Sequence, residues 1–398
     1  MFKHRPMYLI VAGLLVLSML LGACAQATVA PTTAPATEAT NAPAAAAPTV
    51  DIAAALKALE TSVSGTGPNG EQASKAADVV LTDAELAKIK DMKATAAIVM
   101  HYGGNDWSTA QIAGLKDQFA KMGIEVIAVT DANFKPEKQV SDIETVLAKN
   151  PSIIVSIPTD PVATADAYRK AAAQGVKLVF MDNVPKDFAS GKDYTSVVSA
   201  DNYGNGVASG LLMCQKLQPN DKVGLIYHEA DFFVTKQRYN GVKDTLTKYC
   251  PNVQIVEETG IGGPDFAGDG EKAASAMVTK YPDLKAIWAV WDVPAEGVMA
   301  ALRSAGKEKD IQIFTQDLGT NVAVELAKNG VVKGLGAQRP FDQGVTEALL
   351  AGYALLGKEA PAYVALYALP VTHDNVLDAW KAVYHADAPD SIKNAFVP

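Results

Sequence analysis

Short runs rich in valine and isoleucine alternate with longer segments of helical periodicity along most of this chain. The runs that we predict as strands are residues 96–100, 125–129, 152–157, 177–181, 195–199, 222–227, 254–258, 286–290, 311–315, 334–337 and 362–369. The helices that we predict between them are residues 111–122, 136–149, 161–174, 206–217, 233–249, 270–281, 294–305 and 341–356. Such alternation produces parallel sheets with right-handed crossovers. We therefore expect an α/β protein that binds its ligand at the carboxyl ends of its strands.

The length and charge of the chain narrow the class of protein further. The folded body is expected to begin near Ala94, and its roughly 300 residues exceed one ordinary core, so two α/β lobes are predicted. The formal net charge is −9 and the lysines and arginines are scattered, which argues against a nucleic-acid partner. Cysteine and histidine do not occur at a spacing typical of metal sites. We expect neither a metal nor a cofactor.

The N-terminus has the pattern of an export signal. Lys3 and Arg5 precede an apolar run over residues 8–21, and small residues follow it directly before Cys24. The run is shorter than the ~20 residues that a membrane span needs. Bacterial lipoprotein signal peptides look like this, which implies cleavage before Cys24 and lipidation of that residue. An uncleaved N-terminal anchor is the alternative, and both interpretations predict an extracytoplasmic protein at the cell membrane, in the periplasm or on the outer face of the cytoplasmic membrane.

The segment after Cys24 is predicted to be a flexible linker. Residues 25–50 are almost entirely alanine, proline and threonine, so they contain too few large apolar groups to offset the entropy of ordering. Residues 51–60 and 83–90 have helical periodicity, but the glycine-rich stretch at 64–70 interrupts it. We therefore assign residues 1–23 to the signal peptide and residues 24–93 to the lipidated Cys24 with its linker.

Short polar side chains and large aromatic rings follow the predicted strands. They are His101, Tyr102, Asn105, Trp107, Asp182, Asn183, His228, Arg238, Phe266, Trp291, Asp317 and Gln338. Sugar hydroxyls donate to carboxylates and accept from Arg, Asn or Gln, while the C–H face of a sugar ring packs on Trp or Phe. Several carboxylates with a single arginine disfavour an anionic ligand. This set predicts an uncharged polyhydroxyl ligand, with His101 and His228 as polar lining and Trp288 in the core.

From about Ala94 to Thr372 the chain resembles the ribose-binding type of periplasmic solute-binding proteins, which have the type I fold and serve sugar ABC importers. The stretches that carry the resemblance begin at Gly104, Ile157, Met181, Ala200, Lys236, Trp291, Gln316 and Ala337. The resemblance implies two Rossmann-like lobes with parallel sheets, joined by a three-segment hinge near Ala200/Asp201, Gln338/Arg339 and Tyr367. Lobe 1 would comprise residues 94–200 and 339–367, lobe 2 residues 201–338 and 368–375, and residues 376–398 would form a C-terminal extension.

The resemblance also implies which residues contact the ligand. By position they are Asn105, Trp107, Asp182, Asn183, Arg238, Phe266, Trp291, Asp317 and Gln338. Three positions depart from the ribose-binding pattern. Ile157 replaces a polar contact, Asn183 replaces a second arginine, and Trp291 replaces an asparagine. We therefore expect a more apolar pocket with a different hydroxyl pattern.

Together these features predict a lipid-anchored, monomeric receptor without enzymatic activity. It would capture a monosaccharide, either a pentose or a hexose, or a polyol by hinge closure and deliver it to a membrane ABC permease. A nucleoside or cationic ligand is one alternative, and an extracytoplasmic enzyme acting on a sugar is another, which would require a catalytic acid/base pair. Cys214 and Cys250 are predicted to form either a disulfide, which export permits, or two buried free thiols.

Overall fold

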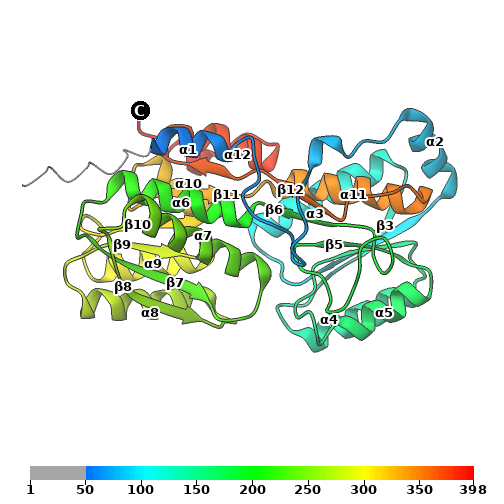
Figure 1. Cartoon of the computed structure of the whole chain (residues 1–398), viewed down its shortest axis with the longest axis horizontal. Helices are drawn as coiled ribbons and strands as arrows, with labels where there is room; N and C mark the ends of the chain where they lie inside the picture. The colour runs from blue at the N-terminus through cyan, green and yellow to red at the C-terminus, as the bar shows by residue number, and fades with distance from the viewer. Residues whose placement is uncertain (1–50) are drawn as a thin grey trace, which may run out of the picture. The chain divides into compact units, whose positions relative to one another are not determined.

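The computed structural model describes residues 51–398, which form two α/β lobes built on separate sheets (Figure 1). This confirms the predicted fold class. Cys24 and the expected signal peptide lie outside the described residues. None of the helices within residues 51–398 has both the length and the hydropathy of a membrane span.

Lobe 1 contains a seven-stranded parallel sheet in the order β1-β12-β6-β5-β4-β2-β3. Its strands are β1 (Ser74–Lys75), β2 (Thr95–Met100), β3 (Glu125–Asp131), β4 (Ile153–Ser156), β5 (Lys177–Met181), β6 (Val197–Ala200) and β12 (Tyr363–Leu366). The inner strands β4 and β6 are buried at every residue, as expected for parallel strands covered by helices on both faces.

Helices cover both faces of this sheet. They are α2 (Asp83–Met92), α3 (Asp106–Lys121), α4 (Pro136–Leu147), α5 (Ala165–Ala173) and α11 (Pro340–Leu356). Leu115 of α3 and Leu350 of α11 share one core with Val179 of β5. Ile143 of α4 and Tyr168 of α5 belong to the core on the other face. The two cores fix the strand ends at which polar residues emerge.

Lobe 2 contains a six-stranded sheet in the order β13-β11-β10-β9-β7-β8. Its strands are β7 (Lys222–His228), β8 (Gln254–Ile261), β9 (Leu284–Ala289), β10 (Gln312–Gln316), β11 (Val332–Ala337) and β13 (Leu369–Val371). β13 pairs antiparallel with β11, whereas the other pairs in this sheet are parallel. We predicted one strand over residues 362–369, but the chain turns after Leu366, so that β12 and β13 join different sheets.

The helices of lobe 2 include its C-terminal residues. They are α6 (Asn202–Lys216), α7 (Phe233–Tyr249), α8 (Phe266–Lys280), α9 (Asp292–Ser304), α10 (Thr320–Ala327), α12 (Val376–Tyr384) and α13 (Asp390–Lys393). Trp380 and Ile392 are buried in the same core as the sheet. Residues 376–398 are therefore part of lobe 2 and not an extension of it.

A disulfide joins Cys214 in the last turn of α6 to Cys250 directly after α7, with their Cα atoms 5.6 Å apart. Of the two alternatives left open by the sequence, the structure contains the bonded pair. The bond ties the carboxyl ends of two neighbouring helices.

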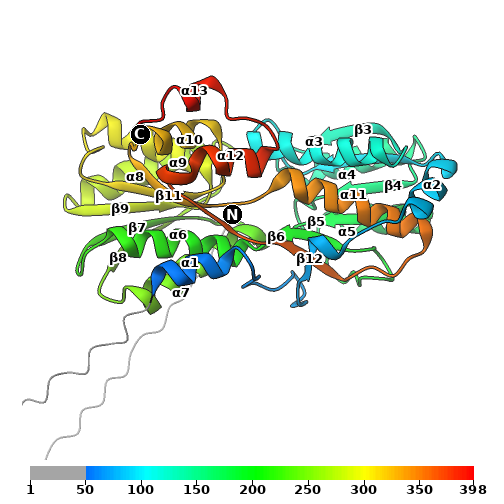
Figure 2. The ribbon, with the colours of Figure 1, turned by 90° about the horizontal axis from the view of Figure 1, so that it is seen from above.

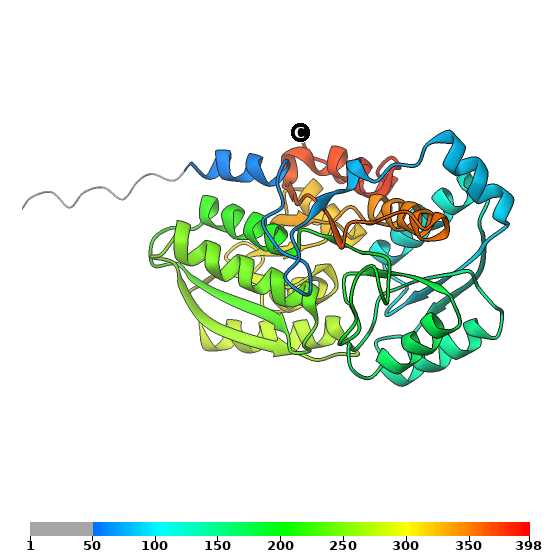
Figure 3. The same ribbon diagram turned by 45° about the vertical axis from the view of Figure 1, so that its right-hand side comes forward.

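Residues 51–93 are folded onto both lobes, which differs from the predicted linker (Figures 2 and 3). Leu59 of α1 (Ile52–Leu59) packs against Ala208 and Leu211 of α6 in lobe 2. Further along, β1 pairs with β12 in lobe 1. The order of this segment comes from partners far away in the sequence, which its own composition does not reveal.

The same segment adds a connection between the lobes. The chain passes between the sheets after β6, after β11 and after β12. It also passes between α1 and β1, where the backbone N–H groups of Ser64 and Gly65 donate to the carboxylate of Asp201 over 2.6 Å and 3.0 Å. We expected three crossings from the resemblance, and the described residues make four.

Candidate functional site

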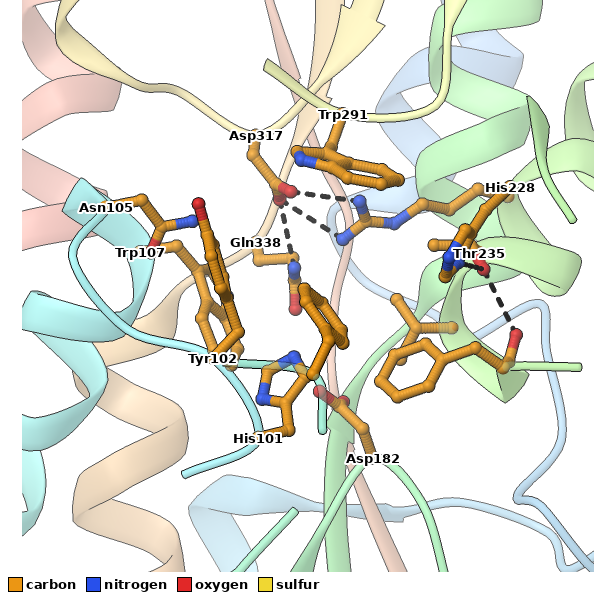
Figure 4. Close-up of a pocket in the computed structure, with 14 residues that line it drawn as sticks. His101, Tyr102, Asn105, Trp107, Asp182, His228, Thr235, Trp291, Asp317 and Gln338 are labelled. Carbon is orange, nitrogen blue, oxygen red and sulfur yellow. Dashed lines mark hydrogen bonds and ion pairs between the residues drawn. The ribbon is translucent and has the colours of Figure 1, made fainter. Parts of the chain in front are cut away.

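A cavity lies where the carboxyl ends of the strands of both sheets face each other (Figure 4). Residues of lobe 1 that line it are His101, Tyr102, Asn105, Trp107, Phe134 and Asp182. Residues of lobe 2 that line it are His228, Phe232, Val234, Thr235, Arg238, Trp291, Asp317 and Gln338. Because both lobes contribute, a molecule in this cavity would contact both at once.

The position of each polar side chain follows from the strand that precedes it. Asp182 directly follows β5, Asp317 follows β10 and Gln338 follows β11. Asp182 has a φ of +56° and Asp317 a φ of +62°, in the left-handed region that non-glycine residues seldom occupy. Aspartate tolerates this conformation better than most residues, and such backbone conformations cluster at ligand-binding sites. Each strand thus ends in a sharp turn that carries its carboxylate to the cavity.

Arg238 of α7 is the centre of the polar wall. Its guanidinium donates to Asp317 through Nη1 over 2.9 Å and through Nη2 over 3.2 Å. Nε donates to Asn202 and Nη1 also donates to the carbonyl of Val290, each over 3.1 Å. Gln338 adds a bond from Nε2 to Asp317 Oδ1 over 2.9 Å. The guanidinium is almost completely buried, and its charge is balanced by Asp317.

Asp182 faces this wall from lobe 1. It is buried and accepts a hydrogen bond from Ser199 Oγ over 2.5 Å. Burial raises the pKa of Asp182 to about 6, although the bond from Ser199 and the charge of Arg238 lower it, while Asp317 raises it further. The site therefore carries one carboxylate more than its single arginine balances.

Aromatic rings from both lobes form the other wall. Phe134 of lobe 1 packs edge-on against Phe266 of lobe 2, with ring centroids 5.4 Å apart. Phe266 in turn lies edge-on to Trp291 at 4.8 Å. His101 of lobe 1 stacks on Phe232 of lobe 2 at 5.5 Å. These contacts give the cavity apolar faces and join the two lobes across it.

The two histidines of the cavity are uncharged at neutral pH. Burial, together with the charge of His228, lowers the pKa of His101 to about 3. Burial lowers the pKa of His228 to about 4, and its Nδ1 lies 3.2 Å from Thr235 Oγ1. Both side chains are thus neutral polar groups, as predicted for a lining role.

Three buried polar atoms of cavity residues have no hydrogen-bond partner within the described residues. They are His101 Nδ1, Trp107 Nε1 and Gln338 Oε1. Buried polar groups are nearly always paired, and an unpaired one costs about 1–3 kcal/mol. These atoms are free to bond hydroxyl groups of a ligand.

Most of the predicted contacts lie together in the cavity. Seven of the nine line it, namely Asn105, Trp107, Asp182, Arg238, Trp291, Asp317 and Gln338. Phe266 is one layer behind, against Trp291. Asn183 is turned away and donates to the carbonyl of Pro158 over 3.0 Å. Ile157, which we expected to replace a polar contact, is fully buried and is not among the residues that line the cavity.

The structure also adds lining residues that we did not predict, above all Phe134 and Phe232. Phe134 follows β3, so applying the strand-end rule to residues 131–134 would have found it. The sequence gives no comparable indication for Phe232, because an apolar residue in a loop is equally compatible with a position in the hydrophobic core and with a position in a binding site. Trp288, which we expected in the core, is fully buried and donates to Ser209 over 3.0 Å.

Residues 51–398 contain no group of three or more His, Cys, Asp or Glu side chains that could hold a metal ion.

The family of periplasmic binding protein domains matches residues 96–359, which include the larger part of both lobes. The chain belongs to the periplasmic binding protein family. As a periplasmic binding protein it is a receptor and not an enzyme, so the enzymatic alternative is wrong.

Relatives support the same conclusion. A ribose import binding protein of Salmonella typhimurium is 24% identical to this periplasmic binding protein over 273 residues, which are 68% of this chain and 88% of the relative. A ribose import binding protein of Bacillus subtilis is 28% identical over 230 residues, covering 57% and 70% of the two chains.

Solved structures have the same fold. An ABC sugar transporter subunit from Rhodobacter sphaeroides is 25% identical with a TM-score of 0.61, covering 71% of this chain and 99% of its own. An ABC transporter solute binding protein from Agrobacterium vitis, bound with alpha-D-tagatopyranose, is 21% identical with a TM-score of 0.67, covering 75% of this chain and 100% of its own. Both confirm the type I architecture.

Proposed function

We propose that this periplasmic binding protein captures a neutral monosaccharide, either a pentose or a hexose, or a polyol, and delivers it to an ABC importer. The observation that carries the proposal is the combination of unpartnered polar atoms with apolar ring faces in one cavity. Trp107 Nε1 can donate to a hydroxyl oxygen and Gln338 Oε1 can accept from a hydroxyl group. A polyol satisfies both, because each hydroxyl donates and accepts.

The charge balance of the cavity supports an uncharged ligand. Arg238 is held by both oxygens of Asp317, so it offers no free positive charge to a phosphate or carboxylate. Asp182 adds negative charge when it is ionised, and His101 and His228 are neutral. A sugar acid or sugar phosphate would therefore be repelled, whereas a neutral sugar would not.

The aromatic wall supports a ligand with an apolar face. Trp107 and Trp291 come from opposite lobes and both line the cavity. The C–H face of a sugar ring packs on such rings and is removed from water. By the resemblance, Trp291 replaces an asparagine of ribose binders in this wall, so we favour a hexose or polyol over ribose itself.

Hinge closure is the proposed mechanism. A ligand that contacts residues of both lobes is bound more tightly by the closed form, so it shifts the population toward that form. The relatives are named for ribose import, and the similar structure from Rhodobacter sphaeroides is an ABC sugar transporter subunit, so we infer that an ABC permease is the partner of this chain. We expect the protein to act as a monomer.

Lipid anchoring through Cys24 is part of the proposal. The basic start, the apolar run and the small residues before Cys24 support cleavage and lipidation there. Residues 25–50, rich in alanine, proline and threonine, would tether the folded lobes outside the cytoplasm at the membrane surface.

A nucleoside is the second candidate ligand. The aromatic side chains around the cavity include Phe134 and Trp291, and a base can stack on such rings as well as a sugar face can. A small organic cation would also be attracted by Asp182 and the rings, although the buried Arg238 opposes it.

A thermal-shift screen tests the proposal, since a ligand raises the melting temperature of the form that binds it. The panel comprises pentoses, hexoses, polyols, nucleosides, sugar phosphates and quaternary amines. We expect a neutral hexose, pentose or polyol to produce the largest shift. A shift produced by a nucleoside or an amine alone, or by a sugar phosphate, would contradict the proposal.

A further inference from the structure

Asp106, the first residue of helix α3 in lobe 1, is hydrogen-bonded to Thr320, the first residue of helix α10 in lobe 2. Asp106 Oδ2 accepts from the backbone N–H and from the hydroxyl of Thr320, each over 2.7 Å. Asp106 and Thr320 are 214 positions apart in the sequence and belong to different lobes. This pair of bonds therefore spans the cleft beside the cavity.

Helix α10 has no cap from its own lobe. Its N-cap position is Gly319, which has no side chain to accept from the free N–H groups of the first turn. A larger residue does not fit there, because a Cβ on Gly319 would lie 2.1 Å from Asp292 Oδ2. Asp106 of lobe 1 supplies the acceptor for the N–H group of Thr320 that the side chain at the N-cap position cannot provide. Its negative charge also suits the positive end of the helix dipole.

The neighbours of Asp106 face the cavity. Asn105 lines it and caps α3 by accepting from Ser108 N over 2.9 Å, and Trp107 lines it as well. Of these three consecutive residues, Asn105 and Trp107 therefore line the cavity, and Asp106 forms hydrogen bonds with the opposite lobe. A ligand that orders this turn of the chain also orders Asp106.

We propose that Asp106 is a latch that stabilises the closed lobes by capping α10 across the cleft, and so sets ligand affinity without touching the ligand. The affinity part rests on the proposed function, because it requires a ligand in the cavity. The bonds to Thr320 exist only when the lobes approach each other, so they favour the closed form over the open one. An apparent dissociation constant rises as the closed, binding-competent fraction falls.

A double-mutant cycle measures the latch. D106A removes the accepting oxygens, and T320V removes the hydroxyl donor while keeping the shape of the side chain. We expect D106A to weaken binding of the best sugar from the screen by about tenfold, mainly through faster dissociation. T320V should weaken it by a few-fold, and T320V should add little in the background of D106A because the partner oxygen is already gone.

D117A is the matched control. Asp117 is on the same helix, has an exposed side chain and pairs with Lys121 of its own lobe over 2.6 Å. Its replacement removes the same charge from α3 without affecting the contact between the lobes. Sugar affinity should therefore stay within twofold of the parent.

The closed population is measured separately without ligand. Spin labels at K116C in lobe 1 and K328C in lobe 2, both at exposed positions, report the distance between the lobes in the full chain carrying C24S. We expect D106A to shift the distance distribution to longer values and D117A to leave it unchanged. Unchanged distances and twofold or smaller effects on affinity in D106A would overturn the latch. If no sugar binds to the parent, the proposed function is wrong. The spin-label distances, which are measured without ligand, still show whether Asp106 stabilises the closed lobes.

Discussion

Arg238 and Asp317 form a two-point ion pair between helix α7 and the loop after β10, with Nη1 2.9 Å from Oδ2 and Nη2 3.2 Å from Oδ1. The guanidinium of Arg238 is almost completely buried. Two parallel bonds fix both side chains in one orientation, so the polar wall of the cavity is set before a ligand arrives. This pre-organisation reduces the cost of ordering the site on binding.

Removing Asp317 should destabilise the protein, because it leaves the buried charge of Arg238 without its ion-pair partner. We expect D317A to lower the free energy of unfolding by about 3–5 kcal/mol, measured by denaturant titration. D310A is the control, since Asp310 is an exposed aspartate paired with Lys307 on the surface. A D317A variant as stable as D310A would show that the pair contributes nothing to the folded state.

Asp182 should give the protein a pH-dependent stability of known sign. Burial raises the pKa of this carboxyl group to about 6, from an ordinary value of 3.8. The folded protein therefore keeps this proton at pH values where the unfolded chain has lost it. The contribution of Asp182 to the free energy of unfolding falls as the pH rises from about 4 to about 6, and stays low above that window.

The variant D182N removes this titration. We expect it to match the parent near pH 4 and to exceed it by up to ~3 kcal/mol at pH 7, measured by denaturant titration across the range. The lowered pKa values of His101 and His228 make the free energy of unfolding rise with pH. D182N and the parent share this effect, so it cancels in the difference between their free energies of unfolding. A difference that does not change with pH would contradict this assignment.

The disulfide between Cys214 and Cys250 should stabilise lobe 2. The two residues are 36 positions apart, and closing a loop of that length contributes roughly 3–4 kcal/mol in the chain-entropy model. We expect the double variant C214S/C250S to lose stability of that order in denaturant titration. Thiol counting on the denatured, unreduced parent should detect no free thiol from Cys214 or Cys250. Two titratable thiols from this pair would exclude the disulfide.

Cys24 should anchor the protein. We expect C24S to appear in the soluble fraction or to remain as an unprocessed precursor, because the lipid attachment site is gone. Cell fractionation with mass spectrometry of the mature N-terminus is the measurement. Membrane retention of C24S together with the absence of a lipid adduct on the parent would contradict the proposed anchor.

Much of the fold follows from the alternation of apolar runs and helical segments. Parallel strands such as β4 and β5 are buried on both faces, so they appear in the sequence as continuous apolar stretches. The strand-end rule then predicts where Asp182, Asp317 and Gln338 emerge. Their convergence in one cavity required the resemblance to a known family, because no local pattern tells which strands become neighbours.

Other features depend on contacts that a local pattern cannot encode. Strand β1 has two residues and exists because β12 offers it a partner. The backbone N–H groups of Ser64 and Gly65 donate to Asp201, which is more than 130 positions away in the sequence. The glycine-rich stretch that we predicted as part of a linker is therefore an ordered connection between the lobes. Phe134 is part of the aromatic wall because its ring meets Phe266 of the opposite lobe. Each of these relationships joins segments that are far apart in the sequence.

The central claim is that this cavity binds a neutral sugar or polyol through its polar wall and its aromatic wall together. Calorimetry with the best ligand from the screen tests it on the parent, D317A, R238A, W291A and the exposed control D310A. We predict that D317A, R238A and W291A each weaken binding at least tenfold, because each removes a buried contact worth about 1–3 kcal/mol, whereas D310A binds like the parent. Parent-like affinity in D317A, R238A and W291A would contradict the assignment of the cavity as the binding site.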